Sequence, residues 1–412
     1  MKRFSLSAFI VLFLSLSFSS NPPGWYVQTL PVNDFVNDIF FLDSLNGWVV
    51  TQGDNNPVDT SYIMSTTNGG NNWAIQLSQP QSLNVIQFLD INTGYAAGGT
   101  GSGFARMYKT SNGGTNWMLV SPPPVHLIID SYFINKDTGW ACDDDILFGG
   151  LYKTTNGSVS WVQQLDASYK IQNIFFINKD TGWTFGRYDG ISSKLFRTTN
   201  GGNNWNLQNT FTQQLNDIYF FNEFVGIISS GFSYKTTDGG FNWVLTNDGG
   251  IELSFGSDSV GWAGNNFTTI IKTTDAGSSW FRQTTNISNP SVSAINNLKV
   301  WAAGSGIVHT TNGGLTAIEH NTEIPNHFIL YQNYPNPFNP ITVIRYSLNE
   351  NRIVNLIVYD ALGKKVTTLV NEKQSAGSYE IEFDGSGLSS GIYFYKIEAG
   401  DFRQVKRMVM VK

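Results

Sequence analysis

The chain has 412 residues, of which 14 % are aromatic and only 14 % are charged, and its formal net charge is −6. An average globular protein carries roughly 25 % charged residues, and disordered chains are poor in aromatic residues, so a largely unfolded chain is excluded. The acidic balance argues against nucleic acid as a partner, because phosphate contacts need clustered lysine and arginine. The 41 glycines favour tight turns over long helices, so the composition predicts a turn-rich β-protein.

Residues 1–20 are predicted to be a signal peptide. Lys2 and Arg3 supply positive charge, an apolar run follows over residues 8–18, and small residues come next. This run is too short to span a bilayer, and we expect no transmembrane segment in the mature chain. A core helix is the other interpretation. The lone Cys142 cannot form an internal disulfide, so packing alone must hold the mature protein together outside the cell.

Residues 21–318 contain seven copies of one sequence repeat. Repeats of this length are typical of propellers and solenoids. One motif is Lys-Thr-Thr-Asn-Gly-Gly-x-x-Trp with variations, and it alternates with an apolar strand followed by Gly-Trp or a variant. Each repeat contains four short strand patterns. Seven units of four antiparallel strands predict an all-β fold, a seven-bladed β-propeller.

The two ends of the repeat region suggest how the ring closes. Residues 25–28 copy the outer strand of the other units but have no turn motif before them. The seventh turn motif, over 309–314, has Ala317 where tryptophan is expected. We therefore expect the N-terminal strand to supply the outer strand of the seventh blade.

The turn motif matches the Asp-box pattern, Ser/Thr-x-Asp-x-Gly-x-x-Trp. Asp or Asn can accept backbone N–H bonds in such a turn, and glycine takes the positive φ. The tryptophan is expected to be buried between blades, so Trp205→Ala should cost about 3–5 kcal/mol. Ser158 replaces the second glycine of the third copy, where we expect strain. The structural box residues are Thr66, Asn68, Gly70, Trp73, Asn112, Trp117, Asn156, Trp161, Asn200, Trp205, Asp238, Trp243, Asp275, Trp280 and Asn312.

Variation in repeat length falls on the loops between the second and third strands of blades one to four. These loops lie on the face opposite the Asp boxes, and variable loops on a rigid scaffold are where binding concentrates. They carry aromatic and a few polar residues that suit a glycan or peptide; packing of the loops themselves is the other interpretation. The Asp143–Asp145 run lacks the ligand pattern of a known calcium loop and is expected to be solvated. The candidate ligand-binding residues are Phe104, Asp143, Asp144, Asp145, Phe148, Arg187, Tyr188 and Asp189.

Motifs for other chemistry are weak. The four histidines show no metal-ligand spacing. The glycine-rich stretch 98–103 lacks the lysine and the helix of a phosphate-binding loop. We therefore predict no catalytic residue, no metal and no cofactor.

Residues 331–412 differ from the repeats and follow a predicted linker over 319–330. Residues 321–412 hold 10 basic and 9 acidic side chains, whereas residues 21–320 hold 13 and 22. Alternating patterns predict strands over 342–348, 355–359, 365–369, 379–383, 392–397 and 405–411, separated by glycine turns. This is the pattern of a small immunoglobulin-like β-sandwich.

The tail resembles the type A sorting domain of the type IX secretion system of Bacteroidota. The resemblance rests on residues 358–363 and 388–393 and on a sorting motif made of Tyr334, Pro335, Asn336, Pro337, Phe338, Asn339, Pro340 and the closing Lys412. It implies that the type IX machinery is a partner of this domain. It also implies export through the periplasm to the cell surface or the medium.

The repeats resemble the Asp-box (BNR repeat) propellers, most closely the photosystem II assembly and stability factor group. The recurring Phe-x(5–7)-Gly-Trp and Thr-Thr-Asp/Asn-Gly-Gly-x-x-Trp pairs carry this resemblance, which implies a scaffold more than an activity. We therefore expect a non-enzymatic binding or adhesion module with an unknown extracellular glycan or protein ligand. The alternative is a glycan-degrading hydrolase of the sialidase or xyloglucanase type, which a carboxylate pair across the mouth of the axis would favour.

Overall fold

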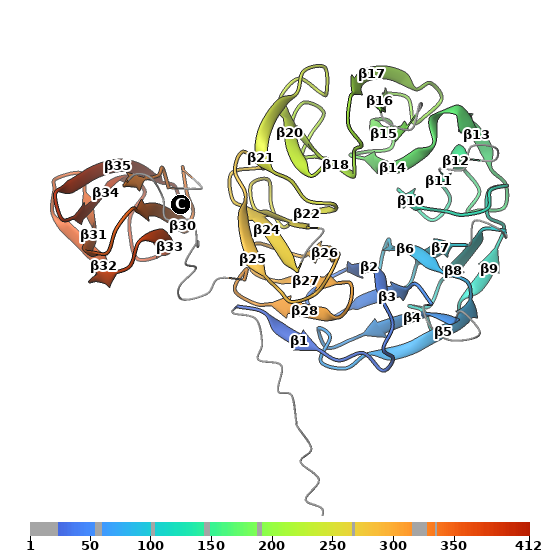
Figure 1. Ribbon diagram of the computed structural model, residues 1–412, viewed down its shortest axis with the longest axis horizontal. Helices are drawn as coiled ribbons and strands as arrows, with labels where there is room; N and C mark the ends of the chain where they lie inside the picture. Colours follow the sequence, from blue (N-terminus) through green and yellow to red (C-terminus); the bar gives the residue numbers. More distant parts are fainter. Residues whose placement is uncertain are drawn as a thin grey trace, which may run out of the picture.

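The computed structural model describes residues 24–53, 60–99, 104–143, 149–187, 192–265, 268–314, 328–333 and 336–412. Over these residues the chain is all-β apart from one 3-10 turn, η1 (Ala167–Tyr169). Seven four-stranded sheets are arranged around a central axis, and two further sheets form a separate sandwich (Figure 1). The predicted seven-bladed propeller followed by a small β-sandwich is confirmed.

Each blade is antiparallel, and its strands run in order from the axis to the perimeter. Blades one to three comprise β2 (Val36–Phe41), β3 (Gly47–Thr51), β4 (Thr60–Thr66), β5 (Ala74–Pro80); β6 (Leu83–Phe88), β7 (Gly94–Gly98), β8 (Arg106–Thr110), β9 (Met118–Val120); β10 (Asp130–Phe133), β11 (Gly139–Asp143), β12 (Gly150–Thr154) and β13 (Val162–Leu165). Blades four to six comprise β14 (Ile171–Phe176), β15 (Gly182–Arg187), β16 (Ser193–Thr198), β17 (Asn206–Phe211); β18 (Asp217–Phe220), β19 (Gly226–Ser229), β20 (Phe232–Thr236), β21 (Val244–Asp248); β22 (Leu253–Phe255), β23 (Gly261–Gly264), β24 (Thr269–Thr273) and β25 (Phe281–Thr284).

Blade seven combines the two ends of the propeller. Its inner strands are β26 (Ser291–Ala294), β27 (Val300–Ala303) and β28 (Ile307–Thr310), and its outer strand is β1 (Tyr26–Gln28). In Figure 1 the blue β1 lies beside the orange β28. Trp25 directly precedes β1, is 1 % exposed and lies against Gly314 of the seventh box. The N-terminal strand thus closes the ring and supplies the tryptophan that the seventh box lacks.

Adjacent blades interlock through aromatic rings. The Gly-Trp tryptophan of one blade stacks on the last phenylalanine of the next innermost strand, as Trp183 does on Phe220 at 3.6 Å. That phenylalanine also covers the glycine opposite it in its own blade: a Cβ on Gly226 would lie 2.6 Å from the Phe220 ring. A phenylalanine at this position therefore requires a glycine opposite it. In blade seven Ala294 replaces the phenylalanine, and Val300 replaces the glycine.

In blades one to six the Asp boxes join the third and fourth strands, and the seventh box follows β28. In the first box the Thr66 hydroxyl accepts the Gly70 N–H at 2.8 Å and donates to Asn68 Oδ1 at 2.9 Å. Asn68 Oδ1 also accepts the Asn72 N–H at 2.9 Å. In the third box Ser158 has φ 72°, in the left-handed region that favours glycine. This confirms the strain expected there.

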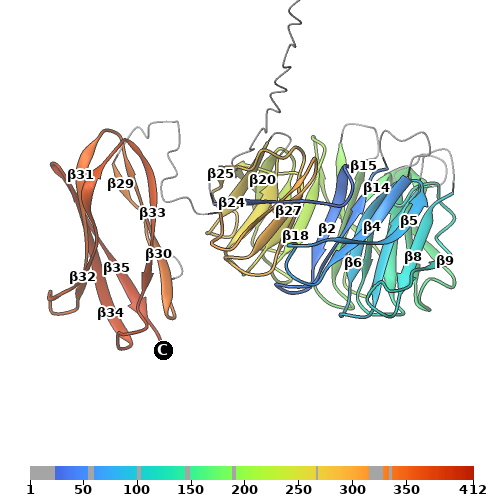
Figure 2. The same ribbon diagram turned by 90° about the horizontal axis from the view of Figure 1, so that it is seen from below.

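The sandwich contains β29 (Ile329–Leu330), β30 (Ile341–Leu348) and β33 (Gly377–Asp384) in one sheet. The other sheet has the order β32 (Lys365–Gln374), β31 (Arg352–Asp360), β34 (Gly391–Ala399), β35 (Phe402–Met410). Figure 2 shows the two sheets packed face to face. Strand β29 lies within the stretch predicted as linker, because its pairing with β30 makes it part of the sandwich.

The sorting motif runs beside the end of β35. Tyr334 and Pro335 lie outside the described residues. Asn336 accepts the Val409 N–H at 2.8 Å, and the buried Phe338 exchanges backbone bonds with Val409 and Val411. The motif therefore fastens the first part of the domain to its last strand.

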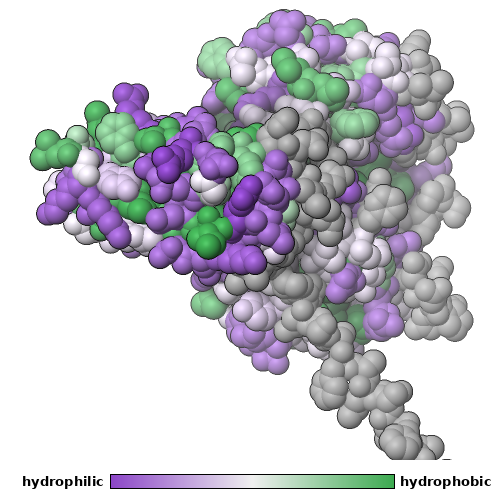
Figure 3. Space-filling view, turned by 60° about the vertical axis from the view of Figure 1, so that its left-hand side comes forward, coloured by the Kyte–Doolittle hydropathy of each residue, from purple (hydrophilic) through white to green (hydrophobic). Residues whose placement is uncertain are grey.

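No helix among the described residues is long and apolar enough to cross a membrane. Figure 3 shows hydrophobic residues scattered among hydrophilic ones over the described surface of the sandwich that faces the viewer. Such scattering is ordinary for a protein surface in contact with water.

Candidate functional site

Of the predicted binding residues, Phe104, Asp143 and Arg187 are among the described residues, and they lie at one face of the propeller, here called the loop face. It carries the connections between the second and third strands of a blade and those from one blade to the next. Phe104 lies just before β8 and is 80 % exposed. Arg187 ends β15 and donates from Nε to Gln172 Oε1 at 3.1 Å and from Nη1 to Gln214 Oε1 at 3.3 Å. It thus joins the edges of blades four and five on this face.

The sequence analysis predicted that Asp143 lies in a solvated loop, and this prediction is wrong. It ends β11, is 1 % exposed and accepts the Leu127 N–H at 3.2 Å. The strand continues one residue further than expected, so Asp143 belongs to β11, in which all five residues are buried. Asp144, Asp145, Phe148, Tyr188 and Asp189 lie outside the described residues.

A second group of polar residues on the loop side lies around the axis, and we call it the axial ring. Its members share one position, three residues before the phenylalanine that ends each innermost strand, or before Ala294 in blade seven. The ring comprises Asp38, Asp130, Asn173, Asp217, Glu252 and Ser291, and blade two has the apolar Val85 at this position. These strands line the centre of the ring in Figure 1.

Hydrogen bonds from the axial ring pass from blade to blade. Asp38 accepts the Ile86 N–H at 2.8 Å, and Asp130 accepts the Ile174 N–H at 2.8 Å. Asp217 accepts the Leu253 N–H at 2.6 Å. The polar side chains also bond one another: Asn173 donates to Asp217 at 2.9 Å, and the Ser291 hydroxyl lies 3.0 Å from an Asp38 oxygen and 2.8 Å from a Glu252 oxygen. The ring is therefore a set of inter-blade links.

Burial raises the pKa of every carboxyl in the axial ring. The pKa of Asp38 rises to about 6, and those of Asp130 and Asp217 rise to about 7. Desolvation is the main cause; backbone N–H bonds oppose it, and neighbouring carboxyls add to it for Asp130, Asp217 and Glu252. The pKa of Glu252 is raised for the same reasons. Asp130 and Asp217, with pKa values of about 7, are therefore expected to change protonation state near neutral pH.

The chemistry open to the axial ring is limited by its bonds. Carboxyls with raised pKa can act as general acids, but three of the four are held by backbone N–H groups of the next blade. Within the described part of the chain, no group of three His, Cys, Asp or Glu side chains is placed to hold a metal ion. The main role of the axial ring is therefore to link neighbouring blades.

The sequence interpretation missed the axial ring. The available signal was the recurrence of Asp or Asn directly before isoleucine, as at Asp38-Ile39, Asn173-Ile174 and Asp217-Ile218. Each one alone resembles the polar residue of an ordinary alternating strand. Only alignment of the seven repeats shows that the same position is acidic or polar in six of them.

Comparison with known proteins divides the chain as the structure does. Residues 332–412 match the family described as the secretion system C-terminal sorting domain. A search of curated proteins found no match. The family match over residues 332–412 identifies the sandwich as a sorting domain.

Solved structures resemble the propeller at low sequence identity. YCF48 bound to D1 peptide aligns with a TM-score of 0.57 at 17 % identity, over 71 % of this chain and 99 % of that one. YCF48 from Cyanidioschyzon merolae aligns with a TM-score of 0.54 at 14 % identity, over 70 % and 98 %. PorZ, a surface component of the type IX secretion system of Porphyromonas gingivalis, aligns with a TM-score of 0.51 at 12 % identity, over 93 % of this chain and 60 % of that one.

The fold and the match define a class: an Asp-box β-propeller carrying a C-terminal sorting domain. The sorting domain marks the protein as one that the type IX secretion system delivers to the cell surface or the medium. At these identities the likeness to YCF48 and PorZ establishes the propeller fold and no more.

Proposed function

We propose that the chain is a non-enzymatic binding or adhesion module that acts outside the cell and recognises an extended ligand with its loop face. The observation that carries this proposal is Phe104, which at 80 % is the most exposed phenylalanine among the described residues, whereas Phe88 and Phe220 pack between blades. An exposed aromatic ring suits stacking on a sugar or on a peptide side chain. The similar propeller of YCF48 has been solved with a bound peptide, which supports an extended ligand.

The test is binding of residues 24–412 to a glycan array and to a peptide array. Phe104→Ala should lower the affinity of any captured probe about tenfold or more, because loss of a stacked ring costs on the order of 1.4 kcal/mol or more. The matched control is Phe241→Ala, since Phe241 is 61 % exposed within the fifth Asp box on the opposite face. Equal affinities for the two variants would contradict a ligand site on the loop face.

Glycan hydrolysis is the second candidate, and the axial ring is the observation that favours it. The pKa values of Asp130 and Asp217, about 7, are in the range of a general acid. Incubation of the protein with captured glycans, followed by mass spectrometry, separates the two functions. Products that disappear in both Asp130→Asn and Asp217→Asn would establish hydrolysis, whereas retention without cleavage supports binding alone.

A further inference from the structure

One side of the sorting domain is open, because both of its sheets end there. Strand β32 pairs only with β31 and β33 pairs only with β30 among the described residues. The outward edges of β32 and β33 therefore present backbone N–H and C=O groups that pair with no described strand. Figure 2 shows the two sheets facing each other on either side of the core.

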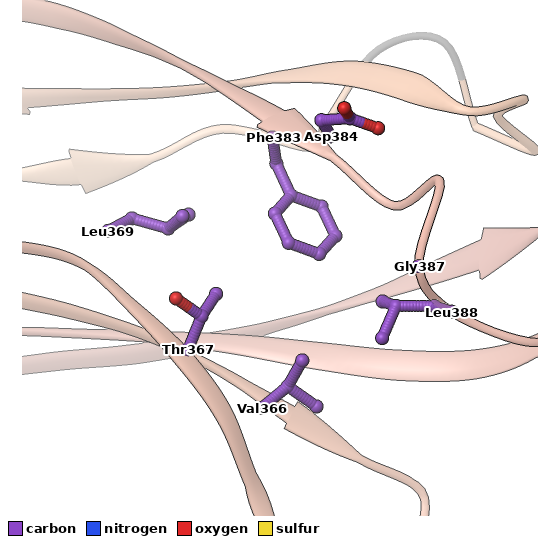
Figure 4. A pocket seen from close by; sticks show the side chains of 7 residues that line it. All are labelled: Val366, Thr367, Leu369, Phe383, Asp384, Gly387 and Leu388. Atoms are coloured by element: carbon purple, nitrogen blue, oxygen red, sulfur yellow. The ribbon is translucent and has the colours of Figure 1, made fainter.

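Strand β32 is irregular at this side. Its register against β31 shifts twice within a few residues, which leaves Val366 and Leu369 without an opposing residue. Such bulges redirect side chains and are frequent at sheet edges and functional sites. Here the two redirected side chains are both apolar, and both turn toward the opening between the sheets (Figure 4).

The opening is a shallow pocket of about 300 Å³, which we call the edge slot. In Figure 4 Phe383 points into it from β33, opposite the residues of β32. Phe383 is itself 4 % exposed, so the slot gives access to the sandwich core. Its lining residues are Val366, Thr367, Leu369, Phe383, Asp384, Gly387 and Leu388.

The size and surroundings of the edge slot indicate its occupant. Small-molecule sites range from about 300 to 1,000 Å³ and enclose their ligand, whereas this slot is open and at the lower limit. Free strand edges beside an apolar pocket instead fit an extended peptide, which pairs its backbone with an edge and inserts alternate side chains. The outer face of the four-stranded sheet offers less, because Lys396 and Arg403 there already pair with Glu398.

We propose that the edge slot is where an extended segment of a type IX export protein docks, adding a strand to β32 or β33 and inserting an apolar side chain. This inference rests on the export role of the sorting domain and names the surface that carries it. The occupant is a protein segment because its backbone can pair with the free edge of β32 or β33 while one of its apolar side chains fills the edge slot.

The test uses the full chain expressed in a bacterium with a working type IX system. Val366→Arg and Leu369→Arg place a charge in the slot, and each should reduce the fraction found outside the cell at least fivefold, with accumulation in the periplasm. The matched control is Ile353→Arg on β31, whose side chain is 68 % exposed and outside the slot. It should be exported within twofold of the wild type.

Folding is checked by the thermal unfolding of each purified chain. If an arginine variant loses the sandwich transition, Thr367→Phe replaces it, since added bulk at this half-buried rim position fills the slot without placing a charge against the core. Normal export of folded slot variants would overturn the proposal while leaving the export role intact. A wild-type chain confined to the periplasm would overturn both. A dimer of the wild-type chain that the slot variants abolish, with export unchanged, would assign the slot to a second copy and reject the export protein.

Discussion

At the level of single residues, four of the blade interfaces place a phenylalanine, Phe41, Phe88, Phe176 or Phe220, between two tryptophans. Phe220 stacks on Trp183 of the preceding blade at 3.6 Å and meets Trp243 of its own Asp box edge-on at 6.0 Å. The two tryptophan classes differ in burial. Trp183 is fully buried, whereas Trp205 and Trp243 of the boxes are half-buried. The Gly-Trp position therefore contributes more to packing than the box position.

This difference changes the expected cost of truncation. Trp183→Ala should lower the free energy of unfolding by about 3–5 kcal/mol, as large buried truncations do. Trp205→Ala should cost clearly less than the value expected from the sequence, because the Trp205 side chain is only half-buried. Denaturant titrations of both variants measure the two losses. Equal losses would contradict the burial difference.

At the level of the element, the N-terminal strand β1 matters more than its three residues suggest. It pairs with β28 from the far end of the repeat region, Tyr26 opposite His309. Gln28 of β1 donates to Gly69 O of blade one at 2.8 Å, so the strand also bonds the next blade. Its removal would leave blade seven with a three-stranded sheet and an exposed edge.

A chain beginning at Thr29 should therefore melt well below a chain beginning at Gly24. The loss includes Trp25, which is 1 % exposed, in addition to the β1 hydrogen bonds. Differential scanning calorimetry of the two chains measures the shift in the propeller transition, while the sandwich transition serves as the internal reference. Equal propeller transitions would show that closure by β1 is dispensable.

Most of the blade architecture was predictable from the sequence, because it repeats. The spacing of the Gly-Trp and Asp-box motifs predicted the blades, and the matching defects at Trp25 and in the seventh box predicted closure. The axial ring was not predictable from one blade. Asp130 and Asp217 occupy an alternating strand like any solvent-facing residue, and only closure of the ring brings them together. The burial of Asp143 was likewise set by where β11 ends, and strand ends are poorly defined by sequence.

At the level of the whole molecule, the axial ring links stability to pH. The pKa values of Asp130 and Asp217 are about 7 in the folded protein, above the ordinary value of 3.8. A carboxyl whose pKa is raised by folding stabilises the fold below its unfolded pKa, and this stabilisation is lost as the pH rises through the folded value. The propeller should therefore lose stability between about pH 4 and pH 7.

Asp217→Asn should remove part of this pH dependence. Asparagine keeps an acceptor for the Leu253 N–H, and blade four already has Asn173 at the equivalent position. We expect the variant to gain stability relative to the wild type at pH 8 compared with pH 4, on the order of 2–4 kcal/mol. Thermal unfolding at both pH values measures this gain.

Asp238→Asn is the matched control, because it changes the same group in an Asp box. The pKa of Asp238 is lowered to about 2 by hydrogen bonds from Asn242 and Thr236. Its stabilising effect is present above the ordinary pKa and is lost as the pH falls toward 2, so the variant should lose stability relative to the wild type at pH 8 compared with pH 2. A parallel pH response of the two variants would contradict the assignment of the neutral-pH effect to the axial ring.

The position of β1 has a consequence for synthesis and export. The strand that completes the last blade is the first part of the propeller to leave the ribosome, and its partner β28 is made only after six other blades. Contacts between residues so far apart in the chain form slowly, because the intervening chain must be brought together first. The propeller therefore cannot close through β1 until its translation is nearly complete. Closure also requires both ends of the propeller to be on the same side of any membrane that the chain crosses.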